Sequence, residues 1–432
     1  MFKYRTTVIA VRRGSPKSRA TRAMINGYHT YWSRPALAKG RKLSIPDYEL
    51  LTMAVSACQF RRLGYPMTLV TDSVGAKFFE TLGVTKLYDN VTTVLDKITG
   101  IDPVVFWAAG KIYAYELIQS PSISIDLDAV CWNIPDDLKE SSFDVGVLHE
   151  DFNDWDCYHS SKELYGALGF RSCNWDWESI PYNVGVLYFD NDMLSTMYSA
   201  ISQMFMENYT RFYTREMLQK RSRSLIKKGR QARVFEQIFA EQQLLSLVTQ
   251  RVGARVYKFT EIDKSIDYIK PNRYVTHLWS MKNAYRLIPE LASTVLSGLL
   301  NKLGTEYDET QDLLNLVQIA YNKRGRTFKG GSIDGTFTFT DTGSFEHSGS
   351  TSGIMRLFTV SNIKGSVKAI ECCFGFEREL QEGSQVVLGE TIKMSENSSL
   401  TVRNNKSVIT VSAKDKILDK DGYVSVRLIK GE

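Results

Sequence analysis

The sequence predicts a mixed α/β domain with a mostly parallel sheet, followed by a helical connector and a small all-β sandwich domain. Up to about residue 145, short apolar β-rich runs alternate with helical patterns, which is typical of βαβ units on a parallel sheet. At 324–335 the composition shifts abruptly to Gly, Ser and Thr, and only period-two alternation follows. We therefore expect domains at 1–290 and 326–432, joined by helices at 291–325.

The elements of the first domain are predicted in order along the chain. Short apolar runs rich in β-branched residues predict strands, and apolar residues at helical spacing predict helices. The expected strands are 6–11, 66–72, 121–132, 182–190 and 255–258, with a terminal element at 274–282. The expected helices are 46–63, 75–82, 106–118 and 193–248. Residues 157–179, rich in Trp, Asn, Asp and Ser, are expected to form a long substrate loop. In the second domain, alternation predicts strands within 335–343, 366–374, 384–394, 398–413 and 422–429.

Composition limits the class of protein. A chain of 432 residues exceeds one ordinary hydrophobic core, and 43% hydrophobic with 24% charged residues is typical of a soluble globular protein. No apolar run reaches the length of a membrane span. The six cysteines include no Cys-x-x-Cys pair, which favours reduced thiols in a cytoplasmic protein. Self-association as a homo-oligomer, carbohydrate binding and attachment to an assembly all remain open roles for the β domain.

Positive charge is concentrated between Arg211 and Arg233, where nine basic residues accompany the single acidic residue Glu216. Such a segment is suited to a polyanion, such as nucleic acid, an acidic glycan or a membrane surface. A solvated surface helix or loop accounts for the same composition equally well.

Residues 121–132 (PSISIDLDAVCW) form the most informative motif of the chain. A short apolar run bounded by Pro121 and Pro135 predicts a buried strand, and it ends in Asp126 and Asp128. Residues two apart on a strand face the same side, so we expect the two carboxylates to lie side by side. Two like charges need a cation between them, and Mg²⁺ or Mn²⁺ leaves positions open for phosphate oxygens. An Asp-x-Asp pair alone also suits an exposed turn.

Three further stretches follow the Asp-x-Asp motif: YNVGVLYF (182–189), EQQLLS (241–246) and HLWSMK (277–282). Together with SIDLDAV (124–130), they resemble the GT-A glycosyltransferases, in particular the glycogenin and galactosyltransferase-like group and related predicted bacterial sugar transferases. The resemblance covers about residues 5–290. It implies a GT-A fold, a Rossmann-like α/β domain that binds a nucleoside diphosphate sugar.

The resemblance implies a metal centre made of Asp126, Asp128 and His277, with Asp126 as a metal ligand or a ribose contact. An imidazole beside two carboxylates suits Mn²⁺, whereas His277 taken alone is more typical of a structural or surface histidine, and only the ordered set of motifs favours a ligand. Lys282 is implied to stabilise the departing β-phosphate. The family usually has glycine three and lysine six residues after the histidine, whereas this chain has Ser280 and Lys282 at three and five.

Asn183 and Gly185 match the family's Asn-x-Gly, which is implied to contact the donor sugar. Glycine lets a backbone approach closely and an amide recognises a hydroxyl, although a β-bulge in a core strand explains the pair as well. Glu241 and Gln242 stand where the family has Asp-Gln. Glu241 would orient the donor, stabilise an oxocarbenium-like centre or act as base, and the polar side of a helix explains it equally.

Five further residues are candidates for contacts with donor or acceptor: Asp72, Tyr31, Trp32, Lys111 and Asp176. The first three follow expected strands, where GT-A folds hold the base and ribose. Lys111, on the helix before the metal strand, is a candidate for the diphosphate. Asp176 lies between two tryptophans and is a candidate acceptor contact or base, because sugar faces stack on indole rings. The same aromatic residues are equally typical of rim or core packing.

The resulting hypothesis is a metal-dependent hexosyltransferase that uses a nucleoside diphosphate sugar, with UDP favoured, and a glycan, protein or nucleic acid acceptor. The resemblance favours retention of configuration. One alternative is a non-catalytic adaptor that keeps the fold and binds a glycan or assembly through its β domain. Another is a metal-dependent phosphohydrolase or nucleotidyltransferase, which does not predict the Asn-x-Gly strand or the late histidine.

Overall fold

The computed structural model describes most of the chain. The described residues are 24–151, 175–212, 235–263, 268–269, 273–278, 281–307, 310–315, 327–329, 332–334, 357–404, 407–414 and 416–428. Four expected features lie wholly or largely outside these residues: the strand at 6–11, the long loop at 157–179, the basic segment 211–233 and the strand at 335–343.

The first domain is built on a seven-stranded sheet with the strand order β3-β2-β1-β4-β7-β6-β8. Its strands are β1 (Asn26–Tyr31), β2 (Met67–Thr71), β3 (Asn90–Thr92), β4 (Ser122–Ile125), β6 (Val145–Glu150), β7 (Tyr182–Phe189) and β8 (Val256–Lys258). Neighbouring strands from β3 to β4 run parallel, as do β6 and β8, whereas β7 runs antiparallel to β4 and β6. The described residues therefore confirm an α/β domain with a mostly parallel sheet.

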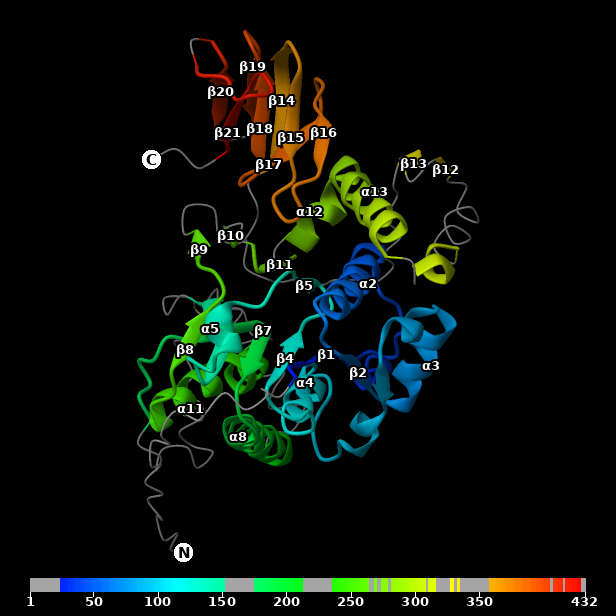
Figure 1. The fold of residues 1–432 in the computed structure, drawn as a ribbon, viewed down its shortest axis with the longest axis vertical. Coiled ribbons are helices and arrows are strands. Elements are labelled where there is room, and N and C mark those ends of the chain that lie inside the picture. Colours follow the sequence, from blue (N-terminus) through cyan, green and yellow to red (C-terminus); the bar gives the residue numbers. More distant parts are fainter. Residues whose placement is uncertain are drawn as a thin grey trace, which may run out of the picture.

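Helices pack on both faces of this sheet (Figure 1). They are α1 (Arg34–Ala38), α2 (Asp47–Arg62), α3 (Ser73–Thr81), α4 (Ala109–Ala114), α5 (Asp136–Lys139), α8 (Asp192–Phe212), α10 (Phe235–Ile238), α11 (Leu244–Val252), α12 (Met281–Leu287) and α13 (Pro289–Glu306). Short 3₁₀ turns lie at Val84–Leu87 and Val94–Lys97, and a π-helical turn at Phe239–Gln243. One core joins α2, α12 and α13 to Ile123 and Ile125 of β4. The other joins α4, α8 and α11 to Leu187 and Phe189 of β7.

Most expected elements of this domain are present, but the strand β1 was not expected. The elements α2, β2, α3, β7 and β8 lie within two residues of their expected bounds, and α4 is shorter than the expected helix at 106–118. β1 pairs with both β2 and β4 and is therefore central to the sheet. Its sequence NGYHTY lacks the apolar run or the alternation that predicts a strand, because polar residues take buried positions. His29 is fully buried, and its two ring nitrogens bond to Tyr88 at 2.6 Å and Ser56 at 3.0 Å.

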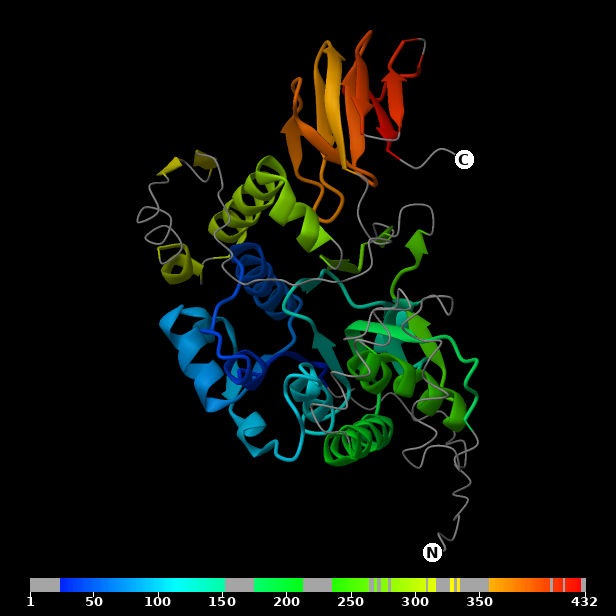
Figure 2. The ribbon, with the colours of Figure 1, turned by 180° about the vertical axis from the view of Figure 1, so that it is seen from behind.

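The helices α12 and α13 lie between the first domain and the C-terminal β strands (Figures 1 and 2). α13 packs on α2, and apolar residues of both helices belong to the core that covers one face of the sheet. Val387 of the C-terminal domain is part of that core, and Phe374 and Phe376 pack against it. The first domain, the helices after it and the C-terminal domain therefore share one hydrophobic core.

The C-terminal domain consists of two four-stranded antiparallel sheets, with the orders β17-β14-β19-β20 and β16-β15-β18-β21. Its strands are β14 (Leu357–Lys364), β15 (Val367–Ile370), β16 (Glu377–Glu379), β17 (Gln385–Val387), β18 (Thr391–Ser395), β19 (Ser399–Arg403), β20 (Val408–Ser412) and β21 (Tyr423–Arg427). Alternate residues, such as Ile392 and Met394 on β18 or Leu400 and Val402 on β19, fill a common core. The predicted all-β sandwich is therefore confirmed. Small hairpins outside these sheets are β9 (Ile262–Asp263) with β10 (Tyr268–Ile269), and β12 (Thr327–Lys329) with β13 (Ser332–Asp334).

Candidate functional site

The Asp-x-Asp motif lies in a turn at the carboxyl end of β4. This strand ends at Ile125, and the N–H of Ala129 donates to the carbonyl of Asp126 at 2.9 Å to close the turn before β5 (Ala129–Cys131). The expectation that both aspartates extend the strand is therefore wrong. The N–H of Asp126 still donates to the carbonyl of Gly185 on β7 at 2.8 Å, and this bond fixes the turn against the sheet.

His277 reaches the same turn from β11 (Val275–His277), which pairs antiparallel with β5 and sets His277 opposite Ala129. Its Nε2 lies 3.4 Å from Oδ2 of Asp128. One ligand atom from each of Asp126, Asp128 and His277 lies within 4.8 Å of the others. Gly185 makes room for the imidazole, because a Cβ at this position would lie 2.7 Å from Cε1 of His277. The glycine of Asn-x-Gly thus accommodates a histidine of this chain.

The three side chains fit a hard divalent cation. Carboxylate and imidazole donors together suit Mn²⁺, and carboxylates suit Mg²⁺. Asp128 and His277 are only 5% and 7% exposed, and Nδ1 of His277 has no hydrogen-bond partner within the part of the chain that the structure describes. The ring nitrogen that faces Asp128 is Nε2, so this atom would be the one to reach a cation held by the two carboxylates.

Lys282 on α12 brings positive charge to this cluster. Its Nζ lies 2.8 Å from Oδ2 of Asp128 and 3.9 Å from Oε2 of Glu49. Burial alone would raise the pKa of Asp128, but Lys282 and His277 outweigh burial and lower this pKa below its ordinary value. Asp128 therefore stays ionised at neutral pH, which is the state that binds a cation.

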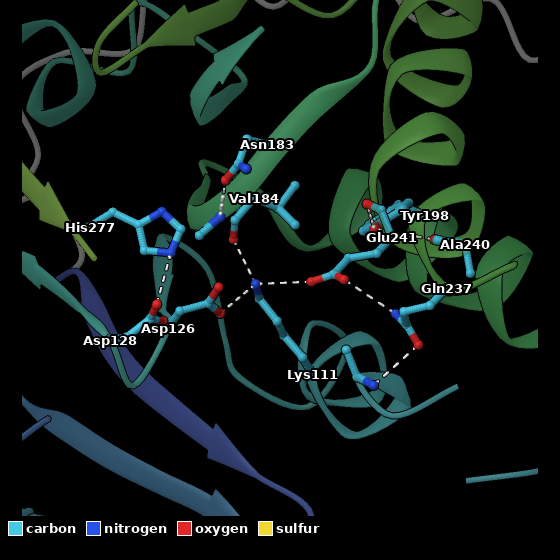
Figure 3. A network of polar contacts seen from close by, with 12 residues as sticks. Lys111, Asp126, Asp128, Asn183, Val184, Tyr198, Gln237, Ala240, Glu241 and His277 are labelled. Carbon is cyan, nitrogen blue, oxygen red and sulfur yellow. Dashed lines mark hydrogen bonds and ion pairs between the residues drawn. The ribbon is translucent and has the colours of Figure 1, made fainter. Parts of the chain in front are cut away.

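Lys111 on α4 lies between two acidic side chains (Figure 3). Its Nζ is 2.6 Å from Oδ1 of Asp126, 2.7 Å from the carbonyl oxygen of Val184 and 3.1 Å from Oε1 of Glu241. An ammonium group has three N–H donors, and these three acceptors use all of them. Burial alone would lower the pKa of Lys111, but Asp126 and Glu241 raise it. In this geometry Lys111 orients Asp126 and Glu241. It has no N–H left to donate to the diphosphate of the donor, the contact for which the sequence made it a candidate.

Glu241 and Gln242 lie in the π-helical turn Phe239–Gln243 between α10 and α11. Such turns are frequent at functional sites. Nε2 of Gln237 donates to Oε2 of Glu241 at 3.2 Å, and Oε1 of Gln237 accepts from the N–H of Ala108 at 3.1 Å. Burial raises the pKa of Glu241, and Lys111 opposes this effect. Gln237 was not a sequence candidate, although its spacing of four residues from Glu241 on a helix was a usable signal.

The acidic and imidazole side chains open onto a cavity of about 240 Å³. It is lined by Asp126, Asp128, Asn183, Val184, Gly185, Glu241, Gln242, His277 and Lys282. All of these except Val184 were sequence candidates, and they come from four separate stretches of the chain, 124–130, 182–189, 241–246 and 277–282. Val184 contributes its backbone carbonyl to Lys111, and no side-chain pattern in the sequence signals such a contact.

Asp72 lies outside the cavity lining and caps a helix. Its Oδ1 accepts from the N–H of Gly75 at 2.7 Å in the first turn of α3. Its Oδ2 accepts from the N–H and the hydroxyl of Ser33 at 2.9 and 2.7 Å. These bonds give Asp72 a structural role that explains its place at the end of β2.

Three other candidates, Tyr31, Trp32 and Asp176, also lie outside the cavity lining. The Tyr31 ring packs edge-on against Phe79 with centroids 4.8 Å apart, and Trp32 is only 7% exposed in the core beneath α4. Asp176 is exposed in a turn, where its Oδ1 accepts from the N–H of Glu178 at 3.2 Å. The structure therefore does not bring these three side chains to the cluster around Asp128.

The fold and the site define an α/β protein with a candidate divalent-metal centre at the carboxyl end of a central strand. The chain belongs to a family of unknown function, DUF6734, whose model matches residues 28–270. The matched range contains the Asp-x-Asp turn and Glu241, and it ends before His277 and Lys282. No curated protein matches the sequence.

Several solved structures show partial similarity to this chain. They include mouse xyloside xylosyltransferase 1 in its apo form, with 10% identity, 55% of this chain and 86% of that chain covered and a TM-score of 0.29. An active-site mutant of LgtC has 9% identity, coverage of 56% and 74% and a TM-score of 0.25. The PaToxG glycosyltransferase has 12% identity, coverage of 67% and 78% and a TM-score of 0.27. Similarities this low establish no shared function.

No helix within the described residues has both the length and the apolar character needed to cross a membrane.

Proposed function

We propose that this chain is a metal-dependent glycosyltransferase that moves a hexose from a nucleoside diphosphate sugar, with UDP favoured, to an acceptor. The observation that carries the proposal is the convergence of Asp126, Asp128 and His277 within 4.8 Å in one cavity. The cavity lies at the carboxyl end of β4, and open α/β sheets bind their ligands at that end of the strands. Carboxylate ligands that leave positions open for phosphate oxygens are typical of nucleotide-dependent Mg²⁺ or Mn²⁺ sites.

The residues of the cluster have separate tasks under this proposal. Asp126, Asp128 and His277 would hold Mn²⁺ or Mg²⁺, which when bound supplies Lewis-acid stabilisation of the charge that grows on the leaving diphosphate. Lys282 brings a second positive charge, since its Nζ is 2.8 Å from Asp128 while its side chain is still 29% exposed. Lys111 keeps the carboxylate of Asp126 in place through the 2.6 Å ion pair.

The sugar would lie beside Asn183, Glu241 and Gln242, whose amide and carboxylate groups suit sugar hydroxyls. Figure 3 shows Glu241 on the opposite side of Lys111 from Asp126. Lys111 and Gln237 each donate one hydrogen bond to Glu241 and hold its carboxylate at the cavity, where it would orient the donor sugar or stabilise its charge. The proposal of a retaining reaction rests on the sequence resemblance.

Incubation of the full chain with UDP- and GDP-hexoses, with and without Mn²⁺, tests the proposal. We expect Mn²⁺-dependent release of one nucleoside diphosphate together with free or transferred hexose, and loss of this release in Asp128→Asn. Asp144→Asn is the matched control, because Asp144 pairs with Arg255 at the surface at 3.2 Å. Acceptors to be supplied include glycans, proteins and DNA.

Two results would contradict the proposal and point to a different class. Release of a nucleoside monophosphate or of inorganic phosphate would favour a nucleotidyltransferase or phosphohydrolase. Absence of both turnover and nucleotide binding would favour a non-catalytic adaptor.

A further inference from the structure

The C-terminal β domain contacts β11 and α12, the two elements that carry His277 and Lys282. Its loop 371–376 connects β15 to β16 and packs against α12, α13 and β11. The hydroxyl of Tyr285, on the same helix as Lys282, donates to Oε1 of Glu371 at 2.7 Å. The hydroxyl of Thr276, directly before His277, donates to the carbonyl oxygen of Cys373 at 3.1 Å.

Glu371 organises this loop. It is only 1% exposed, and its carboxylate accepts from the N–H groups of Cys373 at 2.8 Å and Phe374 at 2.7 Å in addition to Tyr285. A buried carboxylate is unfavourable unless hydrogen bonds compensate for its lost hydration. One of the three compensating donors comes from α12, so the loop conformation and its contact with α12 stabilise each other.

The fit between the loop and α13 is equally close. The ring of Phe376 lies against Gly298 of α13, where a Cβ would be 2.5 Å from the ring carbons. Any side chain at Gly298 would displace the loop. The helix that follows α12 in sequence is therefore held by the β domain on one side and by α2 on the other.

The hydroxyl of Thr276 joins three segments of the chain. It accepts from Nε1 of Trp132 at 2.8 Å and donates to the carbonyl of Cys373. Trp132 directly follows β5, the strand that starts after Asp128, and Thr276 directly precedes His277. A single hydroxyl thus connects the segments of two candidate metal ligands to each other and to the β domain.

We propose that loop 371–376 of the β domain positions the metal ligands, with Thr276 and Glu371 as positioning residues. This inference rests on the proposed metal site. β11 has three residues and, in the described part of the chain, pairs only with β5. Two short strands on their own are marginally stable, so the contacts from the β domain are needed to hold the His277 ring beside Asp128. The β domain is then an integral part of the catalytic unit.

Binding of Mn²⁺ to the full chain, followed by electron paramagnetic resonance, tests this inference. Thr276→Val removes both hydrogen bonds of the hydroxyl at nearly constant volume, and Glu371→Gln places an amide N–H₂ against N–H donors. We expect each variant to bind Mn²⁺ about tenfold more weakly, because groups that orient metal ligands contribute to affinity on this scale. The spectrum of bound Mn²⁺ should also change. Thr276→Ser keeps the hydroxyl and should bind like the parent.

Two matched controls separate positioning from general destabilisation. Thr294→Val removes a bond within α13, from the Thr294 hydroxyl to the carbonyl of Glu290 at 2.9 Å. Glu377→Gln removes a surface pair with Lys393 at 3.2 Å. Both controls should keep the parent affinity and spectrum.

The inference is overturned if Thr276→Val and Glu371→Gln fold and bind Mn²⁺ within about twofold of the parent, well short of the expected loss. Should either variant fail to fold, Tyr285→Phe provides the same test with a milder change: about tenfold weaker binding supports the inference, and unchanged binding overturns it. Absence of Mn²⁺ binding by the parent would instead refute the proposed metal site. The two failures are therefore distinguishable.

Discussion

Replacing Lys282 with methionine should increase the affinity for Mn²⁺ when no nucleotide is present. Nζ of Lys282 lies 2.8 Å from the Oδ2 of Asp128, the carboxylate that would also bind the cation. The lysine therefore satisfies Asp128 and repels a second cation. Methionine keeps the length and most of the volume of the side chain but removes the charge, so Asp128 would depend on the metal for compensation.

The size of this effect follows from the separation of the charges. The ammonium group of Lys282 would repel each unit of charge on a cation about 4 Å away by about 4 kcal/mol at an effective dielectric constant of about 20. The side chain of Lys282 is 29% exposed and the side chain of Asp128 is 7% exposed, so solvent weakens the repulsion at Lys282. About 1–3 kcal/mol then remains, which corresponds to roughly 5- to 150-fold tighter Mn²⁺ binding.

Calorimetric titration of Mn²⁺ into the parent, Lys282→Met and Lys139→Met measures this difference. Lys139 is the matched control, because it pairs with Asp136 at 2.9 Å on the surface of α5. In the presence of Mn²⁺, Lys282→Met should bind UDP more weakly than the parent, since the diphosphate loses a cationic partner. Weaker Mn²⁺ binding by Lys282→Met would refute the reasoning, because the lysine would then support the metal site instead of competing with it.

Three further predictions concern packing, charge and pH. Gly185→Ala should weaken Mn²⁺ binding about tenfold in the same titration, because the alanine Cβ would lie 2.7 Å from Cε1 of His277 and displace the ring. Unchanged affinity would contradict this prediction. Lys111→Met should lower the free energy of unfolding, measured in urea, by about 3–5 kcal/mol, because it leaves Asp126 and Glu241 without their buried cation. A loss below about 1 kcal/mol would contradict this prediction. Burial lowers the pKa of His29 to about 3. As the pH falls from 6.5 towards 3, the His29 ring therefore takes up a proton in the unfolded state but not in the folded state. Stability should therefore fall by about 1 kcal/mol between pH 6.5 and 5.5 in the parent, and His29→Gln should lack this part of the pH dependence.

The fold was predictable where side chains of one kind follow a clear period. β2 (MTLVT) and β7 (YNVGVLYF) are dominated by apolar, β-branched and aromatic residues, and both strands appear at the expected places. β1 was not predictable, because its buried His29 is satisfied by Tyr88 and Ser56, which are distant in sequence. The antiparallel direction of β7 beside β4 also depends on the path of the intervening chain, which the strand sequences do not encode.

The site was predictable as a set of residues but not as a geometry. Eight of the nine cavity-lining residues were named from ordered motifs. The turn at Asp126 was not foreseen, because the bond that closes it joins two backbone groups. The role of Lys111 was missed for a related reason, since one of its three acceptors is the carbonyl of Val184. Asp72 resembled a ligand residue in sequence because helix caps and ligand-binding acids occupy the same position after a strand.

Calorimetric titration of UDP and GDP, with and without Mn²⁺, into the parent and into Asp128→Asn tests most directly whether the cluster of Asp126, Asp128 and His277 is a metal-dependent nucleotide site. We predict that one of the two nucleotides binds the parent only when Mn²⁺ is present, and that Asp128→Asn loses this binding. Equal binding with and without Mn²⁺, or no binding of either nucleotide to the parent, would contradict the proposed function.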